Sequence, residues 1–204
     1  MFGGIKEMSK IYCLMGKSCS GKDTIFEQLM NDKSLDLKPI ILYTTRPKRE
    51  NEIEGKEYFF IDNNELEKYK KMDKIIEMRE YDTINGKWYY CTIDDGQIDL
   101  NKNDYLGIVT LEAYKSFRLN FGEERIIPIY VSLDDGIRLQ RALKREMEQD
   151  IPNYNELCRR FLADNEDFSE EKLECSNITV KYCNYKLDEC IKSIKKIFPI
   201  GRRI

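Results

Sequence analysis

The sequence contains no histidine among its 204 residues. This absence removes the side chain that most often acts as a general base near neutral pH, and with it every Ser-His or Cys-His catalytic arrangement. It also leaves no imidazole for a zinc site, and the seven cysteines include no C-x-x-C pair. Any chemistry must therefore proceed without imidazole, and reduced core thiols are the better interpretation of the cysteines.

The sequence also lacks a strong net charge and a long apolar run. Lys and Arg total 34 against 37 Asp and Glu, which gives a net charge of −3. A balance this even gives no global reason to expect a nucleic acid or a membrane as partner. Nowhere do 18 apolar residues follow one another, and residues 1–10 contain no apolar core of a secretion signal. We therefore expect a cytoplasmic protein in which any anion site is local, and the oligomeric state stays open.

Short apolar runs alternate along the chain with segments of helical period, which is typical of parallel βαβ units in an α/β fold. The length fits one folding unit. We expect strands at residues 11–15, 39–43, 105–110, 126–132 and 178–183. We expect helices at about 22–31, 111–120, 135–148, 154–168 and 186–198. Short strands at 58–61, 75–81 and 87–91 around a helix at 63–72 indicate a small mixed α+β insertion.

A glycine-rich segment follows the first apolar run. Its residues, G-K-S-C-S-G-K-D-T, fit the G-x-x-x-x-G-K frame of a phosphate-binding loop. In such a loop, glycines let backbone N–H groups wrap the phosphates while the lysine reaches the outer oxygens. A strand before it and a helix after it favour this interpretation over an ordinary glycine turn. We expect Lys22 to be catalytic and ATP to bind at Gly16, Lys17, Ser18, Cys19, Ser20, Gly21, Lys22, Asp23 and Thr24.

The position after the loop lysine departs from the usual pattern. Most phosphate-binding loops carry Ser or Thr there, with its hydroxyl on Mg²⁺, whereas this chain has Asp23 followed by Thr24. Because Mg²⁺ commonly keeps several waters, Thr24 could approach the metal through water, or the Asp23 carboxylate could lie in its outer shell. We therefore expect Mg²⁺ as cofactor, bound together with ATP.

A second motif, Y-T-T-R-P-K-R-E-N-E-I-E-G-K-E-Y, extends from Tyr43 to Tyr58. It resembles the T-T-R-x-P-R-x-G-E-x-x-G-x-x-Y stretch of guanylate kinases and follows the loop at that family's spacing. The resemblance implies that Arg46, Arg49 and Tyr58 hold the phosphate of an acceptor, with Arg46 also catalytic. Guanidinium forks and a phenolic hydroxyl suit a phosphate dianion. The alternative is a solvated loop with incidental arginines.

The resemblance extends to the acceptor base. Glu77, in I-I-E-M-R-E-Y, stands at the position of the guanylate kinase glutamate, and a carboxylate there can accept from the N1–H and 2-amino groups of guanine. The alternative for Glu77 is a plain solvent-facing strand residue. The run W-Y-Y-C-T resembles the family's N-Y-Y-G-T and places Tyr89 where a second tyrosine contacts the acceptor phosphate. Thr110 stands where the family has an aspartate. Together with Leu42 and Cys91, it departs from the family pattern and leaves the preference for guanine open.

Arginines gather on two helices after the expected strand at 126–132. Arg138, Arg141 and Arg145 share one helix face at i, i+3 and i+7, and Arg159 and Arg160 open the next helix. This arrangement is similar to the lid of guanylate kinases, whose arginines spread over the migrating phosphoryl group. The resemblance implies catalytic roles for Arg141 and Arg160. By themselves, charged helix faces like these are more often solvated.

The resemblance covers nearly the whole chain and implies a three-layer P-loop kinase fold. It also matches Asn184 to a family asparagine near the nucleotide base. It assigns residues 9–42 and 98–198 to the core, 43–97 to the acceptor-binding insertion, and about 138–160 to a helical lid.

The implied activity is transfer of the ATP γ-phosphoryl group to GMP or dGMP, with these nucleotides as the only partners expected. One alternative is a ribose 1,5-bisphosphate kinase, because such kinases resemble guanylate kinases and often carry Asp after the loop lysine; Glu77 would then be idle. A kinase of another nucleoside monophosphate is a second alternative. A third is a binding module for phosphopeptides that has lost turnover, against which the intact Gly16, Gly21 and Lys22 argue.

Overall fold

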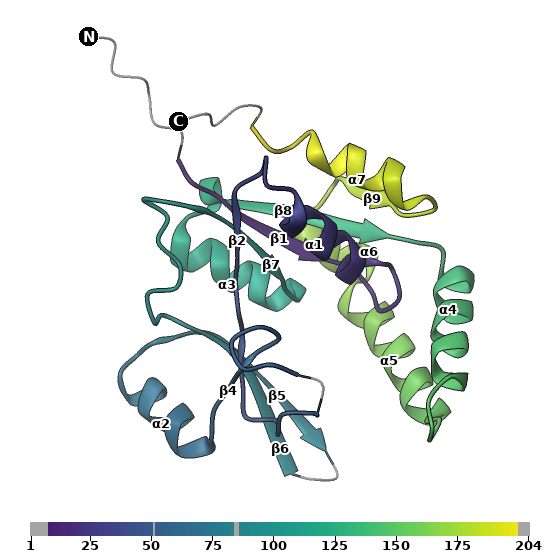
Figure 1. Ribbon diagram of the computed structural model, residues 1–204, viewed down its shortest axis with the longest axis horizontal. Helices are drawn as coiled ribbons and strands as arrows, with labels where there is room; N and C mark the ends of the chain where they lie inside the picture. The colour runs from purple at the N-terminus through teal and green to yellow at the C-terminus, as the bar shows by residue number, and fades with distance from the viewer. Residues whose placement is uncertain (1–7, 51, 84–85, 200–204) are drawn as a thin grey trace.

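A computed structural model of the protein describes residues 8–50, 52–83 and 86–199. Its centre is a five-stranded sheet in the order β2-β7-β1-β8-β9 (Figure 1). Each pair of neighbouring strands in this sheet is parallel. The strands are β1 (Ile11–Met15), β2 (Leu37–Pro39), β7 (Asp104–Ile108), β8 (Ile126–Ser132) and β9 (Lys181–Cys183).

Helices cover both faces of the parallel sheet, which is why its middle strands are almost continuously apolar. Tyr12 and Leu14 pack toward two helices on one face, whereas Ile11, Cys13 and Met15 pack toward two helices on the other. The first face is covered by α1 (Lys22–Asn31) and α7 (Leu187–Lys195). The second is covered by α3 (Leu111–Phe121) and α6 (Glu170–Cys175). The result is the three-layer α/β architecture that the sequence predicts.

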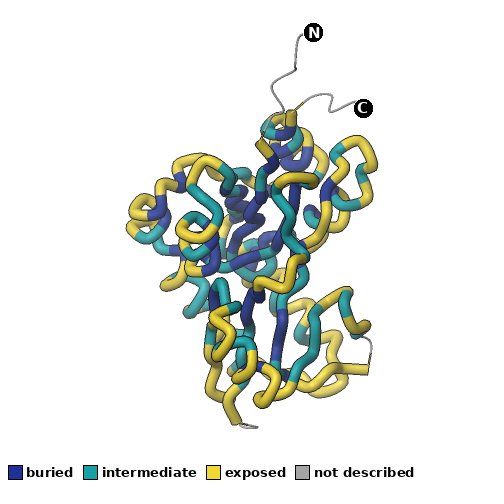
Figure 2. Tube along the Cα trace, turned by 90° about the vertical axis from the view of Figure 1, so that its left-hand side faces the viewer, coloured by how far each residue is buried: buried dark blue, intermediate teal, exposed yellow. Residues whose placement is uncertain are grey.

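A second, mixed sheet lies at the end of the molecule away from the termini (Figure 1). Its order is β4-β3-β6-β5, with β3 and β4 parallel and the other pairs antiparallel. Its strands are β3 (Tyr43–Thr44), β4 (Phe59–Phe60), β5 (Ile75–Thr83) and β6 (Gly86–Ile93). Figure 2 shows a small group of buried segments here, separate from the larger buried centre of the parallel sheet.

Helix α2 (Asn63–Lys71) covers one face of the mixed sheet. It begins with a capping box, in which the Asp62 side chain accepts from the Glu65 amide and the Glu65 side chain accepts from the Asp62 amide. Leu66 is its one buried residue and packs with three residues of the sheet, which are Tyr43, Cys91 and Ile93.

Two further helices, α4 (Asp135–Met147) and α5 (Tyr154–Asp167), pack against each other beside the end of β8 (Figure 1). Asp134 caps α4 and Asn153 caps α5, each through a side-chain oxygen that accepts a backbone N–H of the first turn. A short 3₁₀ helix, η1 (Glu123–Arg125), joins α3 to β8. Among the residues described, no helix combines the length and the apolar character needed to cross a bilayer.

The expected strand at 39–43 is wrong as a single strand. The chain leaves the parallel sheet after β2 and enters the mixed sheet at β3, and residues 40–42 connect the two. The Ile40 amide still donates to the Leu106 carbonyl, whereas the next amide, that of Ile41, donates to the side chain of Gln97. The strands of the mixed sheet lie between residues 43 and 93, and on that basis we keep residues 43–97 as the proposed extent of the insertion.

The small core under α2 gives a prediction of stability. Leu66→Ala removes the one buried side chain of α2, so we expect the free energy of unfolding to fall by about 2–5 kcal/mol. Urea denaturation followed by circular dichroism measures this loss. Met72→Ala, at an exposed position at the end of α2, is the matched control and should cost less than about 0.5 kcal/mol. A loss below about 1 kcal/mol for Leu66→Ala would mean that α2 contributes little to folding.

Candidate active site

The glycine-rich loop lies at the carboxyl end of β1, between that strand and the first turn of α1. A Cβ atom at Gly16 would lie 2.5 Å from the Val131 carbonyl oxygen. Gly21 adopts a left-handed conformation with φ of 91°, and a Cβ atom there would lie 2.3 Å from Nδ2 of Asn184. Both positions therefore require glycine, and the loop presents its amides beside a helix N-terminus, as an anion site demands.

Asn184 supports this loop from the interior. It is 3% exposed, and its Nδ2 donates to the Ser20 carbonyl at 2.8 Å. The sequence places Asn184 near the nucleotide base, but in the structure its side-chain amide contacts the loop backbone instead. Ser20 is itself fully buried, and its hydroxyl has no hydrogen-bond partner among the described residues.

The first residues of the loop are tied to α5. The Ser18 amide donates to Oδ2 of Asp164 at 2.8 Å, and Nζ of Lys17 donates to Oδ1 of Asn165 at 2.7 Å. The N–H of Ser18, one of the residues expected to bind ATP, therefore already has an anionic partner within the protein. Lys17 is thus held by α5 and, through an ion pair of 3.6 Å with Asp135, by α4, whereas Lys22 contacts neither helix through an ion pair among the described residues.

Arg138 is the buried centre of the contact between the loop and the helix pair. Its side chain is 1% exposed, and its Nε donates to the Ser18 carbonyl at 3.0 Å. Its Nη atoms donate to Asp135 at 2.6 Å and to Asp164 at 3.4 Å. The guanidinium also lies over the ring of Phe161. Arg138 thus holds α4, α5 and the loop together, and it is not free to follow a migrating phosphoryl group.

Lys22, Asp23 and Thr24 form the first turn of α1. Nζ of Lys22 lies 3.4 Å from Oδ2 of Asp23, and the Asp23 and Thr24 side chains are exposed. Two hard oxygen donors are therefore accessible where the helix meets the loop. They fit a hydrated Mg²⁺ ion that is held chiefly by phosphate oxygens, because Mg²⁺ prefers oxygen ligands and retains water.

Arg46 is rigidly held below the surface of the mixed sheet. Its side chain is 4% exposed, and its two Nη atoms form a fork on the Glu52 carboxylate at 2.6 and 3.0 Å. The hydrogen bonds from Arg46 lower the pKa of Glu52 below its ordinary value. The rings of Tyr58 and Phe60 flank the guanidinium at 5.6 and 5.7 Å. This geometry positions Arg46 without mobile side-chain torsions.

Of the two neighbouring tyrosines of β6, Tyr90 lies beside Arg46, whereas Tyr89, the tyrosine expected at the acceptor phosphate, does not. Nε of Arg46 donates to the Tyr90 hydroxyl at 3.2 Å, and the Tyr90 ring contacts Tyr58. Tyr89 lies on the opposite face of β6, packs with the core under α2, and hydrogen-bonds to Glu80, which raises the pKa of Tyr89. Successive residues of a strand face opposite sides, so alternation from Glu77 through its partner Thr92 would have indicated Tyr90.

Glu77 owes its direction to an irregularity in β5. The register with β6 shifts between Ile75 and Glu77, so that Ile75 pairs with Ile93 and Glu77 with Thr92. Such bulges re-aim side chains and are common near active sites. Glu77 is consequently turned away from the core under α2, and its side chain is only 3% exposed. The alternative of a plain solvent-facing residue is thereby excluded.

Thr110, which the sequence places at the base site, has a structural role in capping a helix. It is the N-cap of α3, where its hydroxyl oxygen accepts from the Ala113 amide at 3.3 Å. A threonine hydroxyl in this bond retains its own O–H donor, so a contact with an acceptor would be limited to donation.

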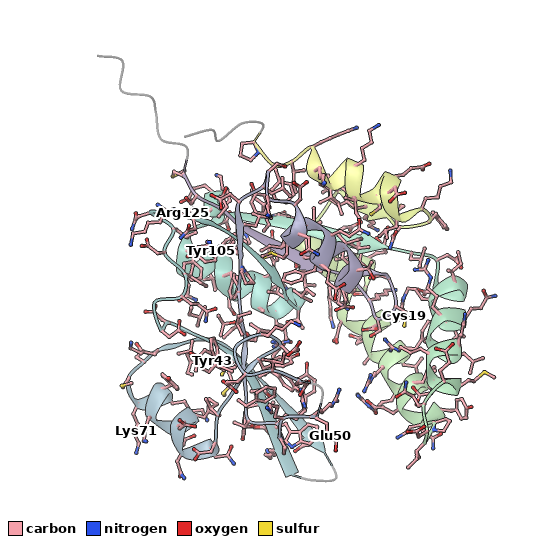
Figure 3. The ribbon with its side chains drawn as sticks, in the orientation of Figure 1. Cys19, Tyr43, Glu50, Lys71, Tyr105 and Arg125 are labelled. Atoms are coloured by element: carbon pink, nitrogen blue, oxygen red, sulfur yellow. The ribbon has the colours of Figure 1, made fainter. Side chains whose placement is uncertain are left out.

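A cleft of about 590 Å³ joins the loop, the helix pair and the acceptor segment. Arg49 lines it from the mixed-sheet side with an exposed side chain for which no ion pair forms among the described residues. In Figure 3, Cys19 of the loop and Glu50, the neighbour of Arg49, lie on opposite sides of this cleft. The other charged or loop residues of its lining are Ser18, Cys19, Arg138, Arg145, Glu146, Glu156, Arg160 and Asp164.

The remaining lid arginines differ in how tightly they are held. Arg160 and Arg159 share the Glu156 carboxylate, with Nε distances of 2.8 and 2.7 Å. Hydrogen bonds from Arg159 and then Arg160 lower the pKa of Glu156 to about 2. Nη1 of Arg141 makes a long contact of 3.5 Å with the Cys19 carbonyl. Arg141 and Arg160 are therefore close to the loop and the cleft without being buried.

Comparisons with known proteins agree with this geometry. The guanylate kinase family model matches residues 8–199. A guanylate kinase of Mycoplasmoides gallisepticum is 28% identical over 187 residues, covering 84% of this chain and 92% of that protein. A guanylate kinase of Rhodopirellula baltica is 24% identical over 194 residues, covering 95% and 92% of the two chains.

A solved structure shares the fold. The crystal structure of guanylate kinase from Anaplasma phagocytophilum superimposes with a TM-score of 0.64 at 18% sequence identity, covering 94% of this chain and 85% of that one. The family match over nearly the whole chain, together with the loop and the paired arginines of the acceptor segment, leads to one conclusion. The chain belongs to the guanylate kinase family.

Proposed function

We propose that this protein is a phosphotransferase that moves the γ-phosphoryl group of ATP to GMP or dGMP and releases the nucleoside diphosphates. One observation carries the proposal: the loop, Arg160 and Arg49 line a single cleft of about 590 Å³. A donor phosphate at the loop and an acceptor phosphate at Arg49 would share this space. We propose a cytoplasmic location as well, from composition alone.

The donor site is formed by the loop and the first turn of α1. The Ser20 amide donates to the Lys17 carbonyl, whereas the amides of Cys19, Gly21 and Lys22 are directed to no acceptor among the described residues. These amides and the N-terminus of α1 provide partial positive charge for the β- and γ-phosphates. Nζ of Lys22 adds a full charge at the same place. Mg²⁺, bound with ATP and served by Asp23 or Thr24, supplies positive charge to the phosphate oxygens.

The acceptor site combines a fixed and an adaptable arginine. Arg46 is held by Glu52, whereas Arg49 is exposed and lines the cleft. The Tyr58 ring and the Tyr90 hydroxyl lie beside Arg46, and the two phenolic groups would complete a set of donors for a phosphate dianion. Burial raises the pKa of Tyr58, so this hydroxyl stays protonated and able to donate at neutral pH.

Base recognition is assigned to Glu77. Its carboxylate has about four lone-pair sites. Nε of Arg79 takes one on Oε2 at 3.1 Å and Oγ1 of Thr92 takes one on Oε1 at 2.9 Å, whereas Nη2 of Arg79 makes only a long contact of 3.5 Å with Oε1. The remaining sites can accept from the N1–H and the 2-amino group of guanine, a pair of donors that adenine does not offer.

The chemistry requires positioning and charge rather than a strong base. The attacking atom is already a phosphate oxygen, so no proton has to be removed before an in-line transfer. Arg141 and Arg160, at the edge of the cleft, would neutralise the charge that develops on the equatorial oxygens. The absence of histidine is consistent with this mechanism.

One observation favours a second acceptor, ribose 1,5-bisphosphate. Both oxygens of Glu77 already accept hydrogen bonds within the protein. An acceptor without a base would leave this network intact and use the same phosphate site. Asp23, which replaces the Ser or Thr that most phosphate-binding loops carry after the lysine, is also found often in such kinases. The experiment in the next paragraph tests this alternative.

The acceptor is identified by measuring ADP release from ATP·Mg²⁺ with GMP, dGMP, AMP, UMP and ribose 1,5-bisphosphate offered separately. We expect GMP and dGMP to be used best. Glu77→Gln should lower kcat/KM for GMP by roughly tenfold or more, because the amide offers one acceptor and a misplaced donor, while leaving a base-free acceptor unchanged. A wild-type preference for ribose 1,5-bisphosphate would overturn the guanine assignment.

The loop assignment predicts the effect of Lys22→Ala. Removing a cation that contacts the outer phosphates should lower kcat on the order of a hundredfold or more. The melting temperature should stay close to that of the wild type, because the ion pair of Lys22 in the described residues is a contact of 3.4 Å with the exposed Asp23. Lys102→Ala removes a highly exposed lysine paired with Asp99 and serves as control. Normal turnover in Lys22→Ala would remove the loop from the mechanism.

The two neighbouring tyrosines of β6 provide a matched pair. Tyr90→Phe should raise KM for GMP roughly tenfold, because it removes a hydroxyl that faces the acceptor phosphate. Tyr89→Phe removes a hydroxyl on the opposite face and should change KM by less than about twofold. Steady-state kinetics at saturating ATP measures both. Equal effects, or a larger one for Tyr89→Phe, would contradict the assignment of the faces.

A further inference from the structure

Glu77 and Arg79 form an ion pair on the acceptor face of β5. Nε of Arg79 lies 3.1 Å from Oε2 of Glu77, and Nη2 lies 3.5 Å from Oε1. Their side chains are only 3% and 12% exposed. Their cross-strand partners on β6 are Thr92 and Tyr90, so the pair lies beside the residues that hold the acceptor phosphate.

A carboxylate as enclosed as Glu77 is destabilised unless its charge is compensated and its oxygens are hydrogen-bonded. Arg79 supplies the opposite charge, and Oγ1 of Thr92 donates to Oε1 at 2.9 Å. These donors come from two strands and approach both oxygens. They fix the plane of the carboxylate as well as its position, because a rotation of the group would break at least one of the bonds.

This fixed plane matters for a base that presents two parallel donors. Recognition of the N1–H and the 2-amino group requires the two carboxylate oxygens to face the same edge of the base. A carboxylate that rotates freely can still accept one of the two hydrogen bonds, but it loses the second. The second bond is the one that distinguishes guanine from hypoxanthine, which has the N1–H and lacks the 2-amino group.

We propose that Arg79 is a positioning residue for base selection: it holds the Glu77 carboxylate in the one orientation that accepts both donors of guanine. Arg79 acts through Glu77 and leaves the donor site and the phosphate of the acceptor to other residues. This inference rests on the proposed function and deepens it, since it assigns guanine selectivity to a pair of residues.

The test compares GMP with IMP as acceptors, in steady-state assays of ADP release with the full-length wild type, Arg79→Met and Arg79→Lys. For Arg79→Met, kcat/KM for GMP should fall roughly tenfold or more, while kcat/KM for IMP and KM for ATP stay within about twofold. Arg79→Lys keeps the charge without the fork and should lose part of the preference. Arg118→Met removes an arginine of similar exposure that pairs with Glu123, and its GMP to IMP ratio should equal that of the wild type.

A double variant decides whether Arg79 acts through Glu77. In the Glu77→Gln background, Arg79→Met should lower the GMP to IMP ratio no further. An additive loss, an unchanged ratio in Arg79→Met, or an equal fall for GMP and IMP overturns the proposal. If Arg79→Met does not fold, as judged by circular dichroism, the ratio for Arg79→Lys decides. A wild type that uses GMP and IMP equally overturns the guanine proposal itself, a result distinct from failure of Arg79 alone.

Discussion

Guanidinium groups with little exposure are held by carboxylates in this protein, and that pairing organises the cleft. Arg46 is bound by Glu52, Arg79 by Glu77, and Arg138 by Asp135 and Asp164. A buried cation is costly unless it is compensated, and a compensated one has a single orientation. The pairs therefore turn flexible side chains into fixed parts of the site. Because each pair has little net charge, it orients its side chains and adds little attraction for an anionic substrate.

The electrostatic attraction for substrate phosphates comes from cations outside these pairs. The guanidinium of Arg49 forms no ion pair among the residues described, although its backbone amide donates to Glu52, and Lys22 pairs there with its exposed neighbour Asp23. Arg49 lines the cleft, and Lys22 lies at the loop whose residues Ser18 and Cys19 line it as well. A net charge of −3 therefore does not prevent the binding of two anionic substrates, because cations close to the site act locally.

The sequence predicts the layers of this fold better than the direction of individual side chains. The bounds of β1 and β8 and the start of α1 are as expected. Short apolar runs predict the two strands, and the glycine-rich loop predicts where the helix begins. The bulge before Glu77 could not be predicted, since it depends on how β5 pairs with β6. The face of β6 on which Tyr90 lies could have been predicted, because successive residues of a strand point to opposite sides. The role of Asp164 could not have been predicted, because its contact with Ser18 joins residues that are 146 positions apart in the sequence.

The bonds from Ser18 to Asp164 and from Lys17 to Asn165 make the loop and α5 one mechanical unit. We therefore expect that α4 and α5 cannot be replaced by those of a homologue without loss of these contacts. A chimaera that received a foreign pair of α4 and α5 but kept its own loop would lose the partners of residues 17 and 18, and the floor of the nucleotide site would shift with them. We expect exchange of α4 and α5 to preserve these contacts only when residues 17 and 18 and the last turn of α5 are transferred together.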